Sequence, residues 1–147
     1  MNSFDELCKK LTQDIANTMV QGRSWNEGEQ LRFDYAVRYL LIDLWKKHHT
    51  HQDNQSSMQK NKNFYSALKQ YRDPQLIYRM TIYAFDGLQK LDLIYITKDG
   101  YYDRIKMEGS LIRYKATPRL SEMLEELDGH PAITLKPNID IQTILLR

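Results

Sequence analysis

Two short apolar stretches, residues 93–97 (LIYIT) and 111–117 (LIRYKAT), flank a long polar excursion in the second half of the chain. A hairpin needs only about two to five loop residues, so this connection is far longer than strand pairing requires. Its basic and aromatic side chains are Lys98, Tyr101, Tyr102, Arg104 and Lys106. The pattern predicts either a mobile surface loop or a hairpin that projects outward to contact another molecule.

Helical periodicity dominates the rest of the sequence. The expected helices cover residues 3–21, 27–48, 63–71, 74–91 and 118–127. Ser3 and Glu6 form a capping pair ahead of the first helix, and Asp73 followed by Pro74 is a typical start for the fourth. The second is apolar on nearly every side of its latter half, as in a helix buried at the centre of a fold. We therefore expect a mainly helical domain with a small antiparallel β-hairpin.

Two segments lack this periodicity. Residues 48–62 are rich in Gln, Asn, Ser and Lys, which predicts an exposed loop or a disordered insert. Residues 129–147 form a strand-like tail broken by prolines. Such an apolar tail is expected to pair within the fold or with a partner chain, or to be covered by a further segment if the protein is longer. The expected organisation is an N-terminal helix in 1–22, a domain over 27–128, and the tail.

Composition excludes several classes of protein. The hydropathy pattern contains no apolar run of about 20 residues, so no membrane span is expected. The single cysteine, Cys8, cannot form an intramolecular disulfide, and this usage fits a reducing cytoplasm. The net charge of +2 is too small to indicate nucleic-acid binding by itself. The basic excess lies in the middle of the chain, and the C-terminal part is acidic.

Residues that carry catalytic or metal chemistry are not grouped in any familiar spacing. His48, His49 and His51 lie close together, but no cysteine or acidic ligands accompany them. The sequence has no phosphate-binding glycine loop, no nucleophile elbow and no credible Cys/His pair. We therefore expect no enzymatic activity, no metal site and no cofactor.

The order of the expected elements is more informative than any motif. A helix, a short helix, a tight turn, a helix, a strand, a long loop and a strand follow one another, which is the connectivity of a winged helix-turn-helix. Residues 30–127 resemble DNA-binding domains of this class. The segment YDRIKMEGSLIRYKATPRLSEMLEEL is similar to the wings of MarR-type regulators, and its strand, Thr-Pro and helix run is also similar to winged-helix domains of plasmid and phage replication proteins. MarR-type chains end in helices, whereas this one ends in strand-like sequence.

The resemblance implies a recognition helix at 74–91 and a wing at 97–111, with Arg104 as the wing-tip arginine. Arg113 and Lys115 alternate with apolar residues and so share one face of their strand. The expected DNA-binding residues are Gln75, Tyr78, Arg79, Ile82, Lys98, Tyr102, Arg104, Lys106, Arg113 and Lys115. The opposite face of the recognition helix is expected to pack on the core through Ile77, Met80, Thr81, Ala84, Leu88 and Leu91. Asp86 lies on the outer side and would repel phosphate.

The leading expectation is binding of double-stranded DNA, as a transcriptional regulator or as a replication or mobile-element protein. The alternative is a winged helix that docks a protein partner, or the N-terminal domain of a larger protein; the mild net charge and Asp86 favour it. The apolar stripe of the first helix is not needed to complete a helix-turn-helix. We therefore expect it to be buried in a homodimer, with packing on its own core as the other solution.

Overall fold

The computed structural model describes residues 4–19, 25–50, 55–58, 73–103 and 108–127. This part of the chain is mainly helical, with a small three-stranded antiparallel sheet. Its elements are α1 (Phe4–Met19), α2 (Glu27–Thr50), β1 (Ser56–Met58), α4 (Pro74–Lys90), β2 (Ile94–Lys98), β3 (Tyr101–Asp103), β4 (Glu108–Ser110), β5 (Ile112–Ala116) and α5 (Pro118–Glu125). The expected helix at 63–71, the tail at 129–147, Arg104 and Lys106 lie outside the described residues.

Capping side chains explain where the helices begin. Asn26 Oδ1 accepts a hydrogen bond from the Glu29 amide at 2.8 Å, and Glu29 Oε1 accepts one from the Asn26 amide at 3.2 Å, which is a reciprocal capping box at the start of α2. Asp73 caps α4 through the Leu76 amide, and Pro74 follows at a position that needs no N–H donor. The predicted starts of α2 and α4 are thereby confirmed.

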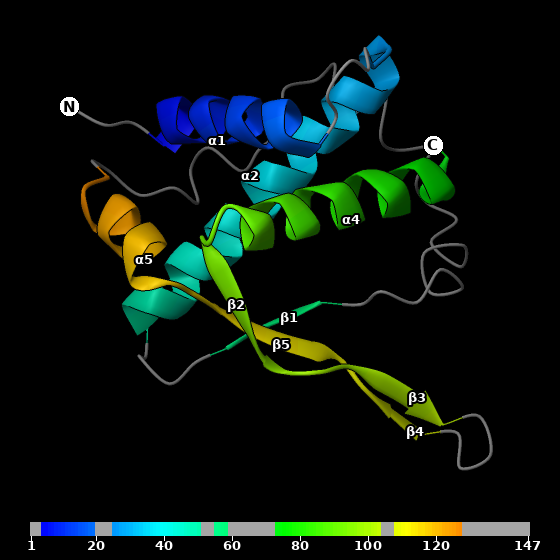
Figure 1. Ribbon diagram of the computed structural model, residues 1–147, viewed down its shortest axis with the longest axis vertical. Helices are drawn as coiled ribbons and strands as arrows, with labels where there is room; N and C mark the ends of the chain where they lie inside the picture. The colour runs from blue at the N-terminus through cyan, green and yellow to red at the C-terminus, as the bar shows by residue number, and fades with distance from the viewer. Residues whose placement is uncertain (1–3, 20–24, 51–54, 59–72, 104–107, 128–147) are drawn as a thin grey trace.

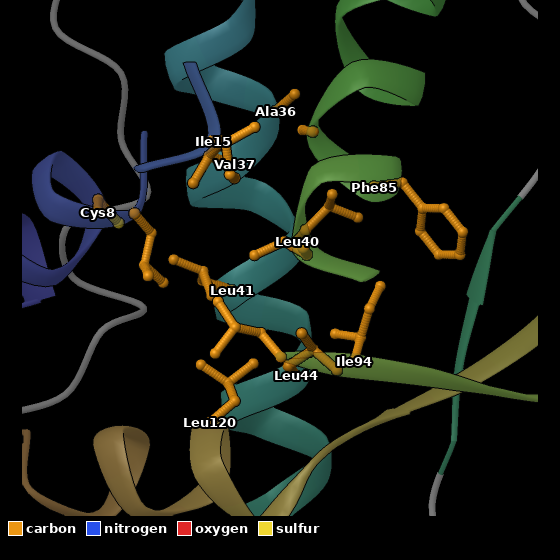
Figure 2. Packing of buried hydrophobic residues seen from close by; sticks show 14 of the residues in the cluster. Cys8, Ile15, Ala36, Val37, Leu40, Leu41, Leu44, Phe85, Ile94 and Leu120 are labelled. Carbon is orange, nitrogen blue, oxygen red and sulfur yellow. The ribbon is translucent and has the colours of Figure 1, made fainter. Parts of the chain in front are cut away.

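Helix α2 passes through the centre of the molecule, with α1 and α4 packed against it and α5 beside its C-terminal half (Figure 1). Its side chains point in several directions into the core, where Val37 and Leu41 are completely buried (Figure 2). The prediction of a central buried helix is therefore confirmed.

The apolar stripe of α1 is covered by its own chain. Phe4, Leu7, Leu11 and Ile15 are all buried, and α1 contacts both α2 and α4. Packing on the core was the second of the two solutions expected for this stripe. The reason for expecting a homodimer, an apolar stripe in need of a partner, was therefore wrong.

Helix α4 is in close contact with α1 at Gly87. A Cβ at this position would collide with the side chain of Ile15, which is itself completely buried. Glycine is thus required here for its small size, because the neighbouring side chain occupies the space that any other residue would need. This contact fixes α4 against the N-terminal helix.

The sheet has the order β1-β5-β2, with both pairs antiparallel. The strands predicted at 93–97 and 111–117 are confirmed, and the first lies one residue later in the chain than predicted. Tyr114 of β5 is buried on the inner face, where its ring packs edge-on against Phe85 of α4 with centroids 5.1 Å apart. The sheet therefore closes the core on the side opposite α1 (Figure 1).

Strand β1 corrects the expected exposed loop at 48–62. Helix α2 continues to Thr50, and Ser56 and Met58 are buried where β1 pairs with β5. A three-residue strand of sequence Ser-Ser-Met has no recognisable β pattern of its own, and its conformation depends on the partner strand.

The polar excursion after β2 is also more ordered than a loop. Strands β3 and β4 pair antiparallel, Tyr101 with Ser110 and Asp103 with Glu108. They extend the sheet into a narrow ribbon that projects away from the helices (Figure 1). Of the two expectations for this segment, the projecting hairpin is the one observed.

Candidate nucleic-acid interface

The outer side of α4 contains four of the expected site residues. Arg79 is the most exposed of them, with 60% of its side chain accessible, while Gln75 and Tyr78 are half-buried. Ile82 packs partly against the hydrophobic core. The N-terminal half of α4 and the ribbon β3–β4 extend toward the same side of the molecule (Figure 1). Arg79 is therefore the best placed of the four to reach a ligand.

The buried face of α4 is rotated from the predicted one. Met80, Ala84 and Leu88 are buried as expected, but Ile77 and Thr81 are only half-buried, and Phe85 is completely buried. Helix α4 packs against α1, α2 and β2 rather than against one surface. These three neighbours bury more of the helix surface than the single apolar stripe that periodicity predicted. The buried surface includes part of Ile82.

Glu29 of α2 lies next to Arg79. Its Oε2 atom is 3.7 Å from Arg79 Nη2, while its Oε1 atom takes part in the capping box with Asn26. The cap holds the carboxylate in place, so the arginine meets a fixed negative charge. Glu29 was not among the expected site residues, although residues 26–29 have the Asn-x-x-Glu pattern of a capping box.

The outer face of the sheet carries further cations. Arg113 is exposed and donates a hydrogen bond from Nη1 to Ser57 Oγ at 2.9 Å. Lys115 is half-buried and pairs in register with Tyr95, which is 44% exposed. The strand thus alternates as predicted, with Tyr114 turned inward and its two basic neighbours turned outward. Ser57 and Tyr95 join this face, and neither was expected.

Lys98 and Arg113 are brought directly opposite each other. The register of β2 and β5 shifts between Ile96 and Lys98, and this irregularity pairs Lys98 with Arg113. Both are exposed, and no described carboxylate forms an ion pair with either. Like charges directly opposite across two strands are destabilising. The arrangement therefore concentrates positive charge at the base of the ribbon, where an anion would relieve the repulsion.

The remaining ribbon residues are placed by their backbone. Tyr102 lies in β3, paired with Gly109 of β4. Arg104 and Lys106 belong to the segment that joins the two strands, outside the described part of the chain. The expectation for the wing tip therefore stays a prediction.

Among the residues that the structure describes, two groups have shifted pKa values, and both belong to the helical side of the molecule. Burial raises the pKa of the Cys8 thiol to about 12. Burial also raises the pKa of Asp34, against the opposing effects of a hydrogen bond from Gln30 and the charge of Arg38. Neither is on α4 or the sheet. Among the described residues there is no group of three or more His, Cys, Asp and Glu side chains that would hold a metal ion.

No family model matches this sequence, and no curated protein or solved structure matches it either. Within the part of the chain that the structure describes, no helix combines the length and apolar character needed to cross a membrane.

Proposed function

We propose that this protein is a winged helix-turn-helix that binds double-stranded DNA through α4 and the ribbon β3–β4. The order of α2, β1, α4, β2, ribbon and β5 supports this assignment, as does a sheet with β5 between β1 and β2. The helix predicted at 63–71 would supply the first helix of the helix-turn-helix, ahead of the turn at Asp73. In this arrangement α4 enters the major groove and the ribbon lies along the adjacent backbone.

The pairing of Lys98 with Arg113 is the observation that carries the proposal. Two exposed cations face each other across the base of the ribbon without a described acidic partner. A DNA phosphate between them would turn a repulsive pair into a favourable contact. Contacts of this kind set the position of a protein on the duplex without reading its sequence.

Base recognition would then belong to α4. Arg79 is exposed and has the fork of donors that pairs with guanine. Arg79 would exchange the Glu29 carboxylate for a base edge or a phosphate. Lys98 and Arg113 therefore supply affinity, and Arg79 supplies selectivity.

A salt titration tests this division of roles. The affinity for a labelled duplex, measured by fluorescence anisotropy, should fall linearly on a log–log plot against salt concentration. The double variant Lys98→Gln/Arg113→Gln should make the slope shallower by about 0.9, because the two cations share one phosphate and each phosphate contact contributes about 0.9. Lys9→Gln/Lys10→Gln is the matched control, because it also removes two charges and both exposed lysines belong to α1, across the molecule from the sheet.

Selection of bound sequences from random duplexes tests the role of α4. Arg79→Ala should relax the preference at one or two base positions, whereas the Lys98/Arg113 variant should weaken binding of all sequences alike. If the wild-type protein binds no duplex even at low salt, the proposal is wrong and α4 with its Arg79–Glu29 pair is better explained as a protein-docking surface.

A further inference from the structure

The outer face of the three-stranded sheet is exposed among the residues that the structure describes. Ile94 of β2 and Tyr114 of β5 turn inward and are buried in the core, so the residues that alternate with them turn outward. The exposed outer residues are Ser57, Tyr95, Thr97, Lys98 and Arg113. The sheet closes the core with its inner face, and its outer face is therefore accessible to a second molecule.

The charge on this face has one sign. Strands β1, β2 and β5 contain Lys98, Arg113 and Lys115 and no aspartate or glutamate. Lys98 and Arg113 pair in register, and the side chain that accepts a hydrogen bond from Arg113 is the neutral Ser57. The nearest carboxylate along the chain, Asp99, lies beyond the end of β2. An anionic ligand is therefore expected.

Tyr95 adds an aromatic ring to the same face. The residue is 44% exposed and pairs in register with Lys115, two positions from Arg113 along β5. Together with Ala116 and Pro118 it also borders a hollow of about 230 Å³, so there is space beside the ring for a flat group. A ligand that covers the whole face must offer both negative charge and an aromatic or heterocyclic ring.

The ring and the guanidinium group are spaced like the parts of a nucleic-acid strand. Two residues along a strand span about 7 Å, which separates Arg113 from the position of Lys115 opposite Tyr95. Successive nucleotides of a stacked strand are about 3.4 Å apart, so the separation corresponds to about two nucleotides. Paired bases in a duplex present their edges in the grooves. The face of the Tyr95 ring therefore requires an unpaired base.

We propose that the outer face of the sheet binds single-stranded DNA, with one unpaired base stacked on Tyr95 and with phosphates held by Arg113 and Lys98. DNA is assigned rather than RNA because the same two cations hold a duplex phosphate in the proposed function, and this choice rests on that function. Every base has a flat face on which an aromatic ring can stack. Single strands should therefore bind with little preference for sequence, unlike a duplex read by α4.

Anisotropy titrations with a labelled oligothymidylate test the stacking. Saturable binding is expected at low salt. Tyr95→Val, which keeps a residue that favours strands, should weaken it about 5- to 100-fold, because stacking on an aromatic side chain contributes about 1–3 kcal/mol per base. Tyr95→Phe retains the ring and should bind like the wild type. Tyr39→Ala is the matched control, because it removes an exposed tyrosine ring from α2 and leaves the sheet unchanged.

A salt titration tests the phosphate contacts. Arg113→Gln should make the log–log slope for the oligothymidylate shallower by about 0.7, the contribution of one phosphate of a single strand. The inference is wrong if the oligothymidylate is not bound, if Tyr95→Phe binds as weakly as Tyr95→Val, or if an oligouridylate of the same length binds more tightly.

The two proposals can fail separately. Tyr95→Val should leave the affinity for a blunt duplex unchanged, because the ring has no unpaired base to stack on. Binding of the duplex without binding of the oligothymidylate would refute the single-strand site alone. Binding of the oligothymidylate without binding of the duplex would refute the proposed function and leave the single-strand site in place.

Discussion

Arg79 Nη2 lies 3.7 Å from Glu29 Oε2, so this exposed cation of α4 has an acidic neighbour on a different helix. The carboxylate is not free to move away, because its other oxygen accepts a hydrogen bond within the capping box of α2. Any anionic ligand of Arg79 must therefore compete with an intramolecular carboxylate. This competition lowers the affinity of Arg79 for every anion. Selectivity between ligands then depends more on the contacts that only the correct ligand makes.

Glu29→Gln should increase the affinity for duplex DNA by about two- to fivefold, because an exposed ion pair of this kind contributes up to about 1 kcal/mol. Glutamine also serves at the third position of a capping box, so α2 should retain its start. Anisotropy titrations with Glu27→Gln provide the control, since this variant removes the same charge from the same turn. Equal increases in the two variants would show that Arg79 is not restrained by Glu29.

Gly87→Ala should destabilise the fold by about 1–2 kcal/mol, although alanine favours a helix over glycine by about 1 kcal/mol. The added methyl group would meet the side chain of Ile15. In an Ile15→Ala background the same substitution should cost little or nothing. Urea unfolding of the four proteins gives the coupling energy, which should be about 1 kcal/mol or more. Additive effects would mean that α1 does not pack on α4 in this way.

The sequence predicted the helices well because the capping residues of each helix, and its apolar residues at three- and four-residue spacing, all lie within that helix. Asp73 with Pro74 was enough to mark the start of α4, and it was confirmed. The sequence predicted that the apolar stripe of α1 is buried. It did not predict which surface covers it, because an apolar stripe does not indicate whether that surface belongs to the same chain or to a second copy. Strand β1 was missed for a related reason: Ser56 and Met58 become a strand only through pairing with β5, far away in the sequence.

Cys8 should resist thiol reagents in the folded protein. It is 5% exposed, and burial raises the pKa of its thiol to about 12. At pH 8 the reactive thiolate should therefore be about a thousandfold rarer than in the unfolded chain. The rate of reaction with Ellman's reagent should be very low in buffer and rise to that of a free thiol in concentrated urea. Rapid modification without denaturant would contradict the packing of α1.

Asp34→Asn should stabilise the protein at neutral pH and not at acidic pH. Burial raises the pKa of Asp34 in the folded state, so the fold favours the protonated form, and stability is lost as the pH rises through the folded pKa. Below the unfolded pKa, about 3.9, both states are protonated and the substitution should have no such effect. Asparagine can still accept the hydrogen bond from Gln30, which is 2.8 Å long in the wild type.

Thermal unfolding at pH 3 and pH 7 measures this difference, with Asp99→Asn as the control at an exposed position. A stabilisation that is the same at both pH values would show that the carboxyl group of Asp34 is not responsible.

The candidate interface was predictable in composition but not in arrangement. Alternation along 112–116 correctly gave Arg113 and Lys115 a common outer face. The pairing of Lys98 with Arg113 depends on an irregularity of register between two strands, and no feature within either strand indicates where such a shift occurs. Glu29 was missed because it is distant from Arg79 in sequence, and only the packing of α2 against α4 brings them together.

In the part of the chain that the structure describes, the sheet is assembled around its last strand. Strand β5 lies between β1 and β2, although both of these precede it in the chain. During translation, neither earlier strand has its partner until the ribosome has added residue 116, whereas α1, α2 and α4 are already synthesised. The helices are thus available to fold first, as local contacts form faster than distant ones. Until β5 arrives, the nascent chain carries two open strand edges, and their shortness limits the risk of pairing with another chain.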